Sequence, residues 1–90
     1  MTLEEIRARI DAVDREILAK LNQRMSLSLE TRQFKTKTKD VERETQLLNQ
    51  IKQETAKYNH LRDTFTEQLF MTIMQESRRL QEIISKEESS

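Results

Sequence analysis

Hydrophobic residues recur every three or four positions along most of the chain, which is the spacing of one face of an α-helix. The first apolar stripe consists of Leu3, Ile6, Ile10, Val13, Ile17 and Leu21. Thr2 precedes this stripe as a candidate N-cap, and Glu5 is placed to complete a capping box. The pattern therefore predicts a first helix from Thr2 to about Lys35, with a length on the order of 50 Å.

A second helix follows after a short polar segment. Residues 36–39 contain no apolar side chain, which predicts a loop, and Asp40 is placed to cap the next helix. The apolar spacing of that helix reaches Tyr58, and residues 59–62 interrupt it.

Asp63 is placed to cap a third helix, whose apolar face reaches Ile84. We expect the charged tail, residues 85–90, to fray. Gly and Pro are both absent from the sequence, so the strongest helix breakers are missing. The predicted fold is all-α, with three helices in a single domain that spans residues 1–90.

Each helical stripe keeps its register but includes polar residues. The first stripe continues as Arg24, Ser28, Thr31 and Lys35. The apolar faces of the second and third helices contain Glu44, Ser77 and Gln81. A helix face that is buried through its apolar half must also bury its polar half or line a cavity with it. We therefore expect two cations, a carboxylate, a hydroxyl and an amide to converge on one pocket.

The two cations of this set indicate an anionic ligand. Arg24 and Lys35 lie eleven residues apart, about 16 Å along a helix, and their long side chains can narrow that distance. The planar guanidinium of Arg can donate hydrogen bonds to both oxygens of a carboxylate, whereas the ammonium of Lys supplies a single charge on a flexible side chain. Ser77 and Gln81 add neutral donors one helical turn apart. The predicted ligand is a small anion with several oxygens.

Composition excludes several other classes of function. The formal net charge is zero, so no global field attracts nucleic acid or an anionic membrane. There is no cysteine, and a lone His60 does not make a zinc site. Neither Ser26 nor Ser28 has a base at a defensible spacing, so any catalysis must rely on orientation and electrostatics. No targeting segment or membrane-spanning stretch is evident, which makes a cytoplasmic protein the expectation.

A partner chain is expected from the size of the protein. Of the 90 residues, 36% are charged and 34% are hydrophobic. This is a small share of hydrophobic residues from which to build a core in so short a chain. A globule of this length has a radius of gyration of about 12 Å, so the predicted first helix would project beyond it. On these residues alone, two interpretations stay open: a ligand site, or a polar seam in a coiled-coil-like interaction module.

Three segments in this order resemble the all-helical type II (AroQ-class) chorismate mutases, over about residues 3–84. The first segment is Ile6-Arg7-x-x-Ile10-Asp11-x-x-Asp14-x-x-Ile17-x-x-x-Leu21-x-x-Arg24. The second is Asp40-x-x-Arg43-Glu44, and the third runs from Leu69-Phe70 to Ser77-x-x-x-Gln81. The resemblance implies an intertwined homodimer in which the long first helices pack together and each of two active sites draws on both chains.

The reaction implied by the resemblance is the Claisen rearrangement of chorismate to prephenate in phenylalanine and tyrosine biosynthesis. This isomerase reaction needs no cofactor and no metal. By resemblance, Arg24 and the partner's Arg7 hold the two carboxylates of the substrate in its reactive conformer, assisted by Ser77 and Arg43. Arg7 precedes Arg24 by seventeen residues, about 25 Å along a helix, so an antiparallel partner would have to bring its Arg7 to the site.

The remaining roles concern the ether oxygen and the ring hydroxyl. By resemblance, Lys35 and Gln81 donate to the ether oxygen, and Glu44 with the backbone near Asp40 takes the hydroxyl. We regard Lys35 as the main catalytic residue, because a cation aimed at charge that appears only in the transition state lowers the barrier.

Two rival functions share this fold. An isochorismate pyruvate lyase would use the same arginines, lysine and glutamine, but Glu44 favours the mutase because it is placed for the hydroxyl of chorismate. The other rival is a non-catalytic helical dimer. Such a dimer would gain stability from apolar residues at the polar positions, so the polar residues found there argue against it. Arg78 and Arg79 depart from the family, which is less charged after the position of Ser77. Either both face solvent, or Arg78 reaches the rim of the site.

Overall fold

The computed structural model describes residues 1–34 and 40–89, so Lys35 and the loop expected at 36–39 lie outside the described residues. The regular elements are α1 (Leu3–Glu30), the 3-10 helix η1 (Thr31–Phe34), α2 (Val41–Thr55) and α3 (Asp63–Ser89). The predicted all-α class is confirmed for the described part of the chain. None of its helices is long and apolar enough to cross a membrane.

Two of the three predicted N-caps are present. The Thr2 hydroxyl accepts a hydrogen bond from the Glu5 amide at 3.1 Å, and the Asp40 carboxylate accepts one from the Arg43 amide at 3.0 Å. Asp63 is instead the first residue of α3, so its prediction as the cap was wrong by one position. Its carboxylate lies in the first turn, where the positive end of the helix dipole favours a negative charge.

The end of α1 also differs from the prediction of one α-helix to about Lys35. The α-helical winding gives way to η1 at Thr31. The Thr31 hydroxyl donates to the Ser28 carbonyl at 2.7 Å, and Arg32 Nε donates to the Leu29 carbonyl at 3.0 Å. These side chains occupy carbonyl groups of the last turn, which favours the tighter 3-10 winding.

The ends of the other two helices lie elsewhere than the hydrophobic spacing indicated. α2 ends at Thr55 rather than Tyr58, because the Tyr58 amide donates to the Thr55 carbonyl at 3.0 Å and closes a tight turn. α3 continues to Ser89, through the tail that was expected to fray. An ion pair of 2.9 Å between Arg32 and Glu88 joins this end of α3 to η1.

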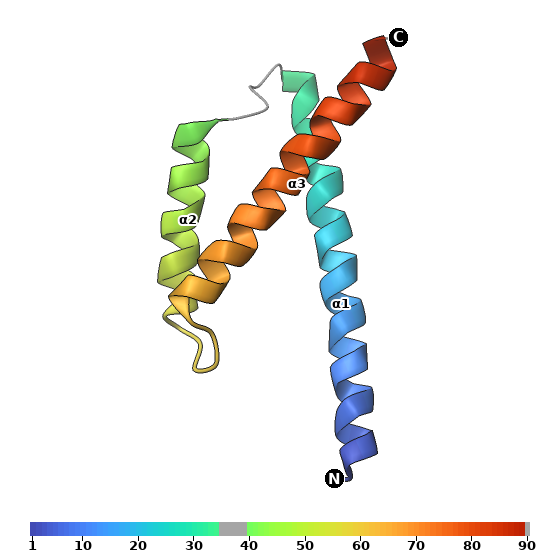
Figure 1. Ribbon diagram of the computed structural model, residues 1–90, viewed down its shortest axis with the longest axis vertical. Helices are drawn as coiled ribbons and strands as arrows, with labels where there is room; N and C mark the ends of the chain where they lie inside the picture. Colours follow the sequence, from blue (N-terminus) through green and yellow to red (C-terminus); the bar gives the residue numbers. More distant parts are fainter. Residues whose placement is uncertain (35–39, 90) are drawn as a thin grey trace.

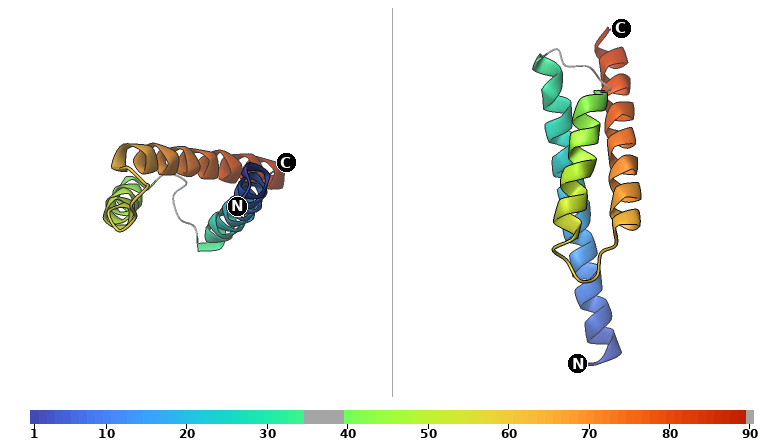
Figure 2. Two further views of the ribbon diagram at one scale, coloured as in Figure 1. Left: turned by 90° about the horizontal axis from the view of Figure 1, so that it is seen from below. Right: turned by 90° about the vertical axis from the view of Figure 1, so that its left-hand side faces the viewer.

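The three helices are arranged around α3. It lies along α2 and crosses the C-terminal half of α1, so that α2 and the end of α1 face each other across a gap (Figure 1). The N-terminal half of α1 projects beyond the other helices (Figure 2). The radius of gyration is 16.4 Å, compared with about 12 Å for a compact globule of this length. The chain is therefore elongated, as the length of the first helix predicted.

The apolar core of the single chain is small. Among the described residues, the buried apolar side chains are Ile73 and Met74, both on α3. Four apolar side chains of α1, which we call the α1 stripe, are between 43% and 53% exposed: Ile6, Ile10, Val13 and Ile17. The stripe lies on the half of α1 that projects away from α2 and α3, so nothing in the described chain covers it.

Candidate active site

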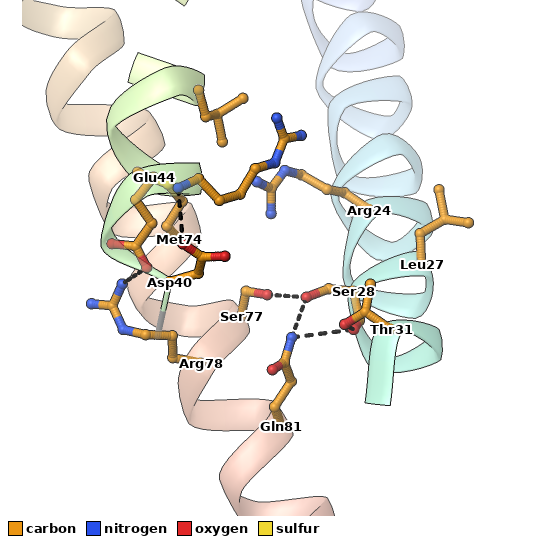
Figure 3. Close-up of a pocket in the computed structure, with 12 residues that line it drawn as sticks. Arg24, Leu27, Ser28, Thr31, Asp40, Glu44, Met74, Ser77, Arg78 and Gln81 are labelled. Carbon is orange, nitrogen blue, oxygen red and sulfur yellow. Dashed lines mark hydrogen bonds and ion pairs between the residues drawn. The ribbon is translucent and has the colours of Figure 1, made fainter. Parts of the chain in front are cut away.

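A cavity of about 400 Å³ lies where the C-terminal part of α1, the start of α2 and the middle of α3 face one another (Figure 3). This volume is within the usual range for pockets that bind small molecules. Six of the site residues predicted from the sequence line the cavity: Arg24, Asp40, Arg43, Glu44, Ser77 and Gln81. Polar residues from the faces of the three helices therefore meet at this cavity, as the periodicity indicated.

Two predicted site residues are not among those that line the cavity. Arg7 is on α1, seventeen residues before Arg24, which places it about 25 Å away along the helix in the same chain. Lys35 lies outside the described residues, so its position in the site stays a prediction.

Arg24 and Arg43 bring two positive charges to the cavity, one from α1 and the other from α2. Arg24 is partly buried, and this burial, with a smaller contribution from the charge of Arg43, lowers the pKa of its guanidinium. Neither guanidinium is in an ion pair with another residue in the described ranges. Two like charges beside a partly desolvated cavity repel each other, and a bound anion would offset the free-energy cost of this repulsion.

Three neutral side chains connect α1 to α3 beside the same cavity (Figure 3). Gln81 Nε2 donates to the Ser28 hydroxyl at 2.7 Å and to the Ser28 carbonyl at 3.1 Å. The hydroxyls of Ser28 and Ser77 are also hydrogen-bonded to each other. The sequence placed Ser28 on the correct face, one turn after Arg24, but assigned it no role in ligand binding. Its observed role is to hold the Gln81 amide at the cavity.

The carboxylate of the site is in an ion pair. Arg78 Nη1 donates to Glu44 Oε2 at 2.6 Å and joins α3 to α2 at the cavity wall (Figure 3). Of the two alternatives left open for Arg78, the structure therefore supports the position at the site. Arg79 pairs instead with Glu76 on the same helix, and its side chain is 61% exposed.

Helical spacing did not identify the Arg78 contact, because consecutive residues of an α-helix point about 100° apart. Ser77 already faces the cavity, so Arg78 reaches it only through the length of its own side chain and the closeness of α2. The distance between α2 and α3 depends on how the helices pack, which helical spacing within one element does not give.

The arrangement is suited to binding an oxyanion. Three arginines and two carboxylates line the cavity together with neutral donors, so the lining has a net positive charge. Within the described ranges no group of three or more His, Cys, Asp or Glu residues is placed to hold a metal ion. Guanidinium groups and an amide can orient a substrate and stabilise developing negative charge.

The family model described as "Chorismate mutase type II" matches residues 6–82. The matched span includes all of the candidate site residues, from Arg7 to Gln81. No curated protein and no solved structure matches the chain.

Proposed function

The chain belongs to the type II chorismate mutase family, and on that basis we propose that it catalyses the Claisen rearrangement of chorismate to prephenate. In this unimolecular reaction the ether carbon–oxygen bond breaks while a carbon–carbon bond forms, without a covalent intermediate on the enzyme. The site must therefore select a conformer and stabilise charge. We further propose that the prephenate formed enters phenylalanine and tyrosine biosynthesis.

The observation that carries this proposal is the pair of guanidinium groups, Arg24 and Arg43, that line one cavity without an ion-pair partner among the described residues. Chorismate has two carboxylates, which would supply the missing negative charge. Arg24 would take one carboxylate with the help of the Ser77 hydroxyl, and Arg43 would bind or organise the same region. A bidentate contact to an Arg fork also fixes the direction of a carboxylate, so that binding would orient the substrate.

Lys35 and Gln81 are our candidates for stabilising the transition state. Negative charge grows on the ether oxygen as its bond to carbon breaks, and donors that already point at that oxygen lower the barrier. Gln81 Nε2 donates both of its hydrogen bonds to Ser28, so in this role one N–H would turn to the ether oxygen while the other holds the amide beside the cavity. Glu44, with the backbone near Asp40, would bind the ring hydroxyl through hydrogen bonds.

We also propose that the active protein is a homodimer in which the partner's Arg7 completes each site. The chain exposes 7862 Å², whereas a folded monomer of this mass exposes about 5,500 Å². The excess, on the order of 2,000 Å², is of the size that obligate interfaces cover. The exposed α1 stripe is the apolar surface that a second α1 would cover. An antiparallel arrangement of the two α1 helices would return the partner's Arg7 to the cavity.

The test of the reaction is to incubate the purified protein separately with chorismate and with isochorismate, and to identify the products by chromatography. Prephenate from chorismate is the expected result. Pyruvate and salicylate from isochorismate, with no turnover of chorismate, would identify the related lyase activity instead. A folded dimer that transforms neither compound would refute a catalytic function for the cavity.

The test of the site compares Arg24→Ala with Arg15→Ala. Arg15 is also on α1 but lies nine residues earlier, on the opposite face of the helix. We expect Arg24→Ala to lower kcat/KM about a hundredfold, the scale of a lost hydrogen bond between charged groups. Arg15→Ala should remain within about twofold of the unmodified protein, as surface substitutions usually do. Equal effects of the two substitutions would contradict the placement of the substrate at Arg24.

A further inference from the structure

We propose that Arg78 is a positioning residue. It holds one carboxylate oxygen of Glu44, so that the other oxygen can accept a hydrogen bond from the ring hydroxyl of chorismate. This inference rests on the proposed function of the site and adds to it a residue that determines how the hydroxyl is recognised. Its basis is the contact of 2.6 Å between Arg78 Nη1 and Glu44 Oε2 at the cavity wall.

The contact leaves Glu44 able to bind a ligand. A carboxylate accepts hydrogen bonds through two oxygens, and in the described part of the chain the hydrogen bond of the Glu44 side chain is made through Oε2 to Arg78. Oε1 thus remains as an acceptor on a side chain that lines the cavity. Because Arg78 fixes Oε2, the carboxylate cannot turn freely, and Oε1 keeps a defined direction.

The contact also supplies charge that the substrate requires. Glu44 brings a negative charge to a cavity proposed to bind a dianion, and unpaired like charges in a partly buried site repel each other strongly. Both side chains of the pair are only about one quarter exposed, at 25% for Arg78 and 24% for Glu44, so water screens the carboxylate incompletely. Arg78 neutralises Glu44 before the dianion arrives, without occupying both of its oxygens.

The ion pairs formed within a helix or turn differ from this one, which joins α3 to α2. The pair of Arg79 with Glu76 and the pair of Lys57 with Glu54 each join residues three apart in sequence. Their basic side chains are 61% and 67% exposed, and neither pair lines the cavity. Arg79 is therefore a matched control, because it is the same residue type, on the same helix, next to Arg78.

The experiment is a double-mutant cycle of Arg78→Met and Glu44→Gln, measured as kcat and KM for chorismate in the full chain. The ring hydroxyl is on the carbon next to the breaking ether bond, but none of its own bonds breaks or forms, so we expect its recognition to contribute mainly to uniform binding. We expect Arg78→Met to raise KM about tenfold, with kcat changed less, given the usual coupling between contacting charged groups. In the Glu44→Gln background the same substitution should change KM less than about threefold, because the charge that Arg78 compensates is already absent.

Three further measurements decide between positioning and general structural support. Arg78→Lys should recover most of the affinity, since one nitrogen makes the observed contact. Arg79→Met should leave KM within about twofold. Thermal unfolding should show that the Arg78→Met variant is folded at the assay temperature. If that variant is unfolded, Arg78→Lys decides the matter: a folded Arg78→Lys variant with KM raised about tenfold would overturn the inference.

The outcomes separate this inference from the proposed function. If the unmodified protein forms prephenate but Arg78→Met has the same effect on KM with Glu44 and with Gln at position 44, Arg78 acts independently of Glu44 and the inference is wrong. If the unmodified protein does not transform chorismate, the proposed function fails, and this inference fails with it.

Discussion

Mixing two impaired variants, Arg7→Ala and Arg24→Ala, should restore activity. If each site takes Arg24 from one chain and the partner's Arg7 from the other, each variant homodimer lacks one cation at both of its sites. A mixed dimer is different, because one of its sites has both arginines and the other has neither. Activity that appears only after the chains have exchanged would show that the sites are shared.

The size of the recovery follows from the geometry. The seventeen residues between Arg7 and Arg24 span about 25 Å of α1, so both side chains cannot contact one small anion from the same chain. Random exchange of equal amounts gives half mixed dimers, each with one intact site of two, so the mixture should have about a quarter of the unmodified activity. Each variant alone should retain about one hundredth, the expected effect of losing a charged hydrogen bond.

The assay is prephenate formation after the two variants have been unfolded together in denaturant and refolded by dilution. The matched control mixes Arg24→Ala with the double variant Arg7→Ala/Arg24→Ala, because no dimer in that mixture has an intact site. A refolded mixture no more active than the mean of its separate components would refute the sharing of sites. Full activity of Arg7→Ala alone would remove Arg7 from the site.

Three other predictions concern catalysis and association. Lys35→Ala should lower kcat on the order of a hundredfold in a chain with unchanged circular dichroism, as the loss of a preorganised donor does; an unchanged kcat would exclude Lys35 from catalysis. Ser28→Ala should lower kcat about fivefold with KM nearly constant, because the Gln81 amide loses its hydroxyl partner at 2.7 Å; a change in KM alone would contradict this. Ile10→Glu in the α1 stripe should give an inactive monomer by light scattering, since a charge would be buried in the interface; a dimer would exclude the stripe as the contact surface.

The sequence predicted which residues line the cavity wherever it was enough to know which face of a helix they occupy. Arg24, Ser77 and Gln81 share a face with apolar residues, so they reach the cavity once those faces pack together. The link between Glu44 and Arg78 could not be predicted in this way, because it depends on the separation of two helices and on the reach of a long side chain.

The ends of the helices were less predictable than their existence. Thr31 continues the polar stripe of the first helix in perfect register, yet η1 begins there because its hydroxyl bonds to the Ser28 carbonyl. Hydrophobic spacing contains no information on such local bonds between side chain and backbone. The same limit applies to α2, which closes at Thr55 through backbone hydrogen bonds of the following turn.

The small apolar core of one chain has a consequence for how this protein responds to dilution. The buried apolar side chains of the described residues are Ile73 and Met74, so if the proposed homodimer forms, most of the stability would come from the surfaces that it covers. Folding and assembly of such a dimer would form one equilibrium, and by the law of mass action the melting temperature would rise with protein concentration. Activity per chain would likewise decline below the dissociation constant of the dimer, so the abundance of the protein would itself regulate how many working sites exist.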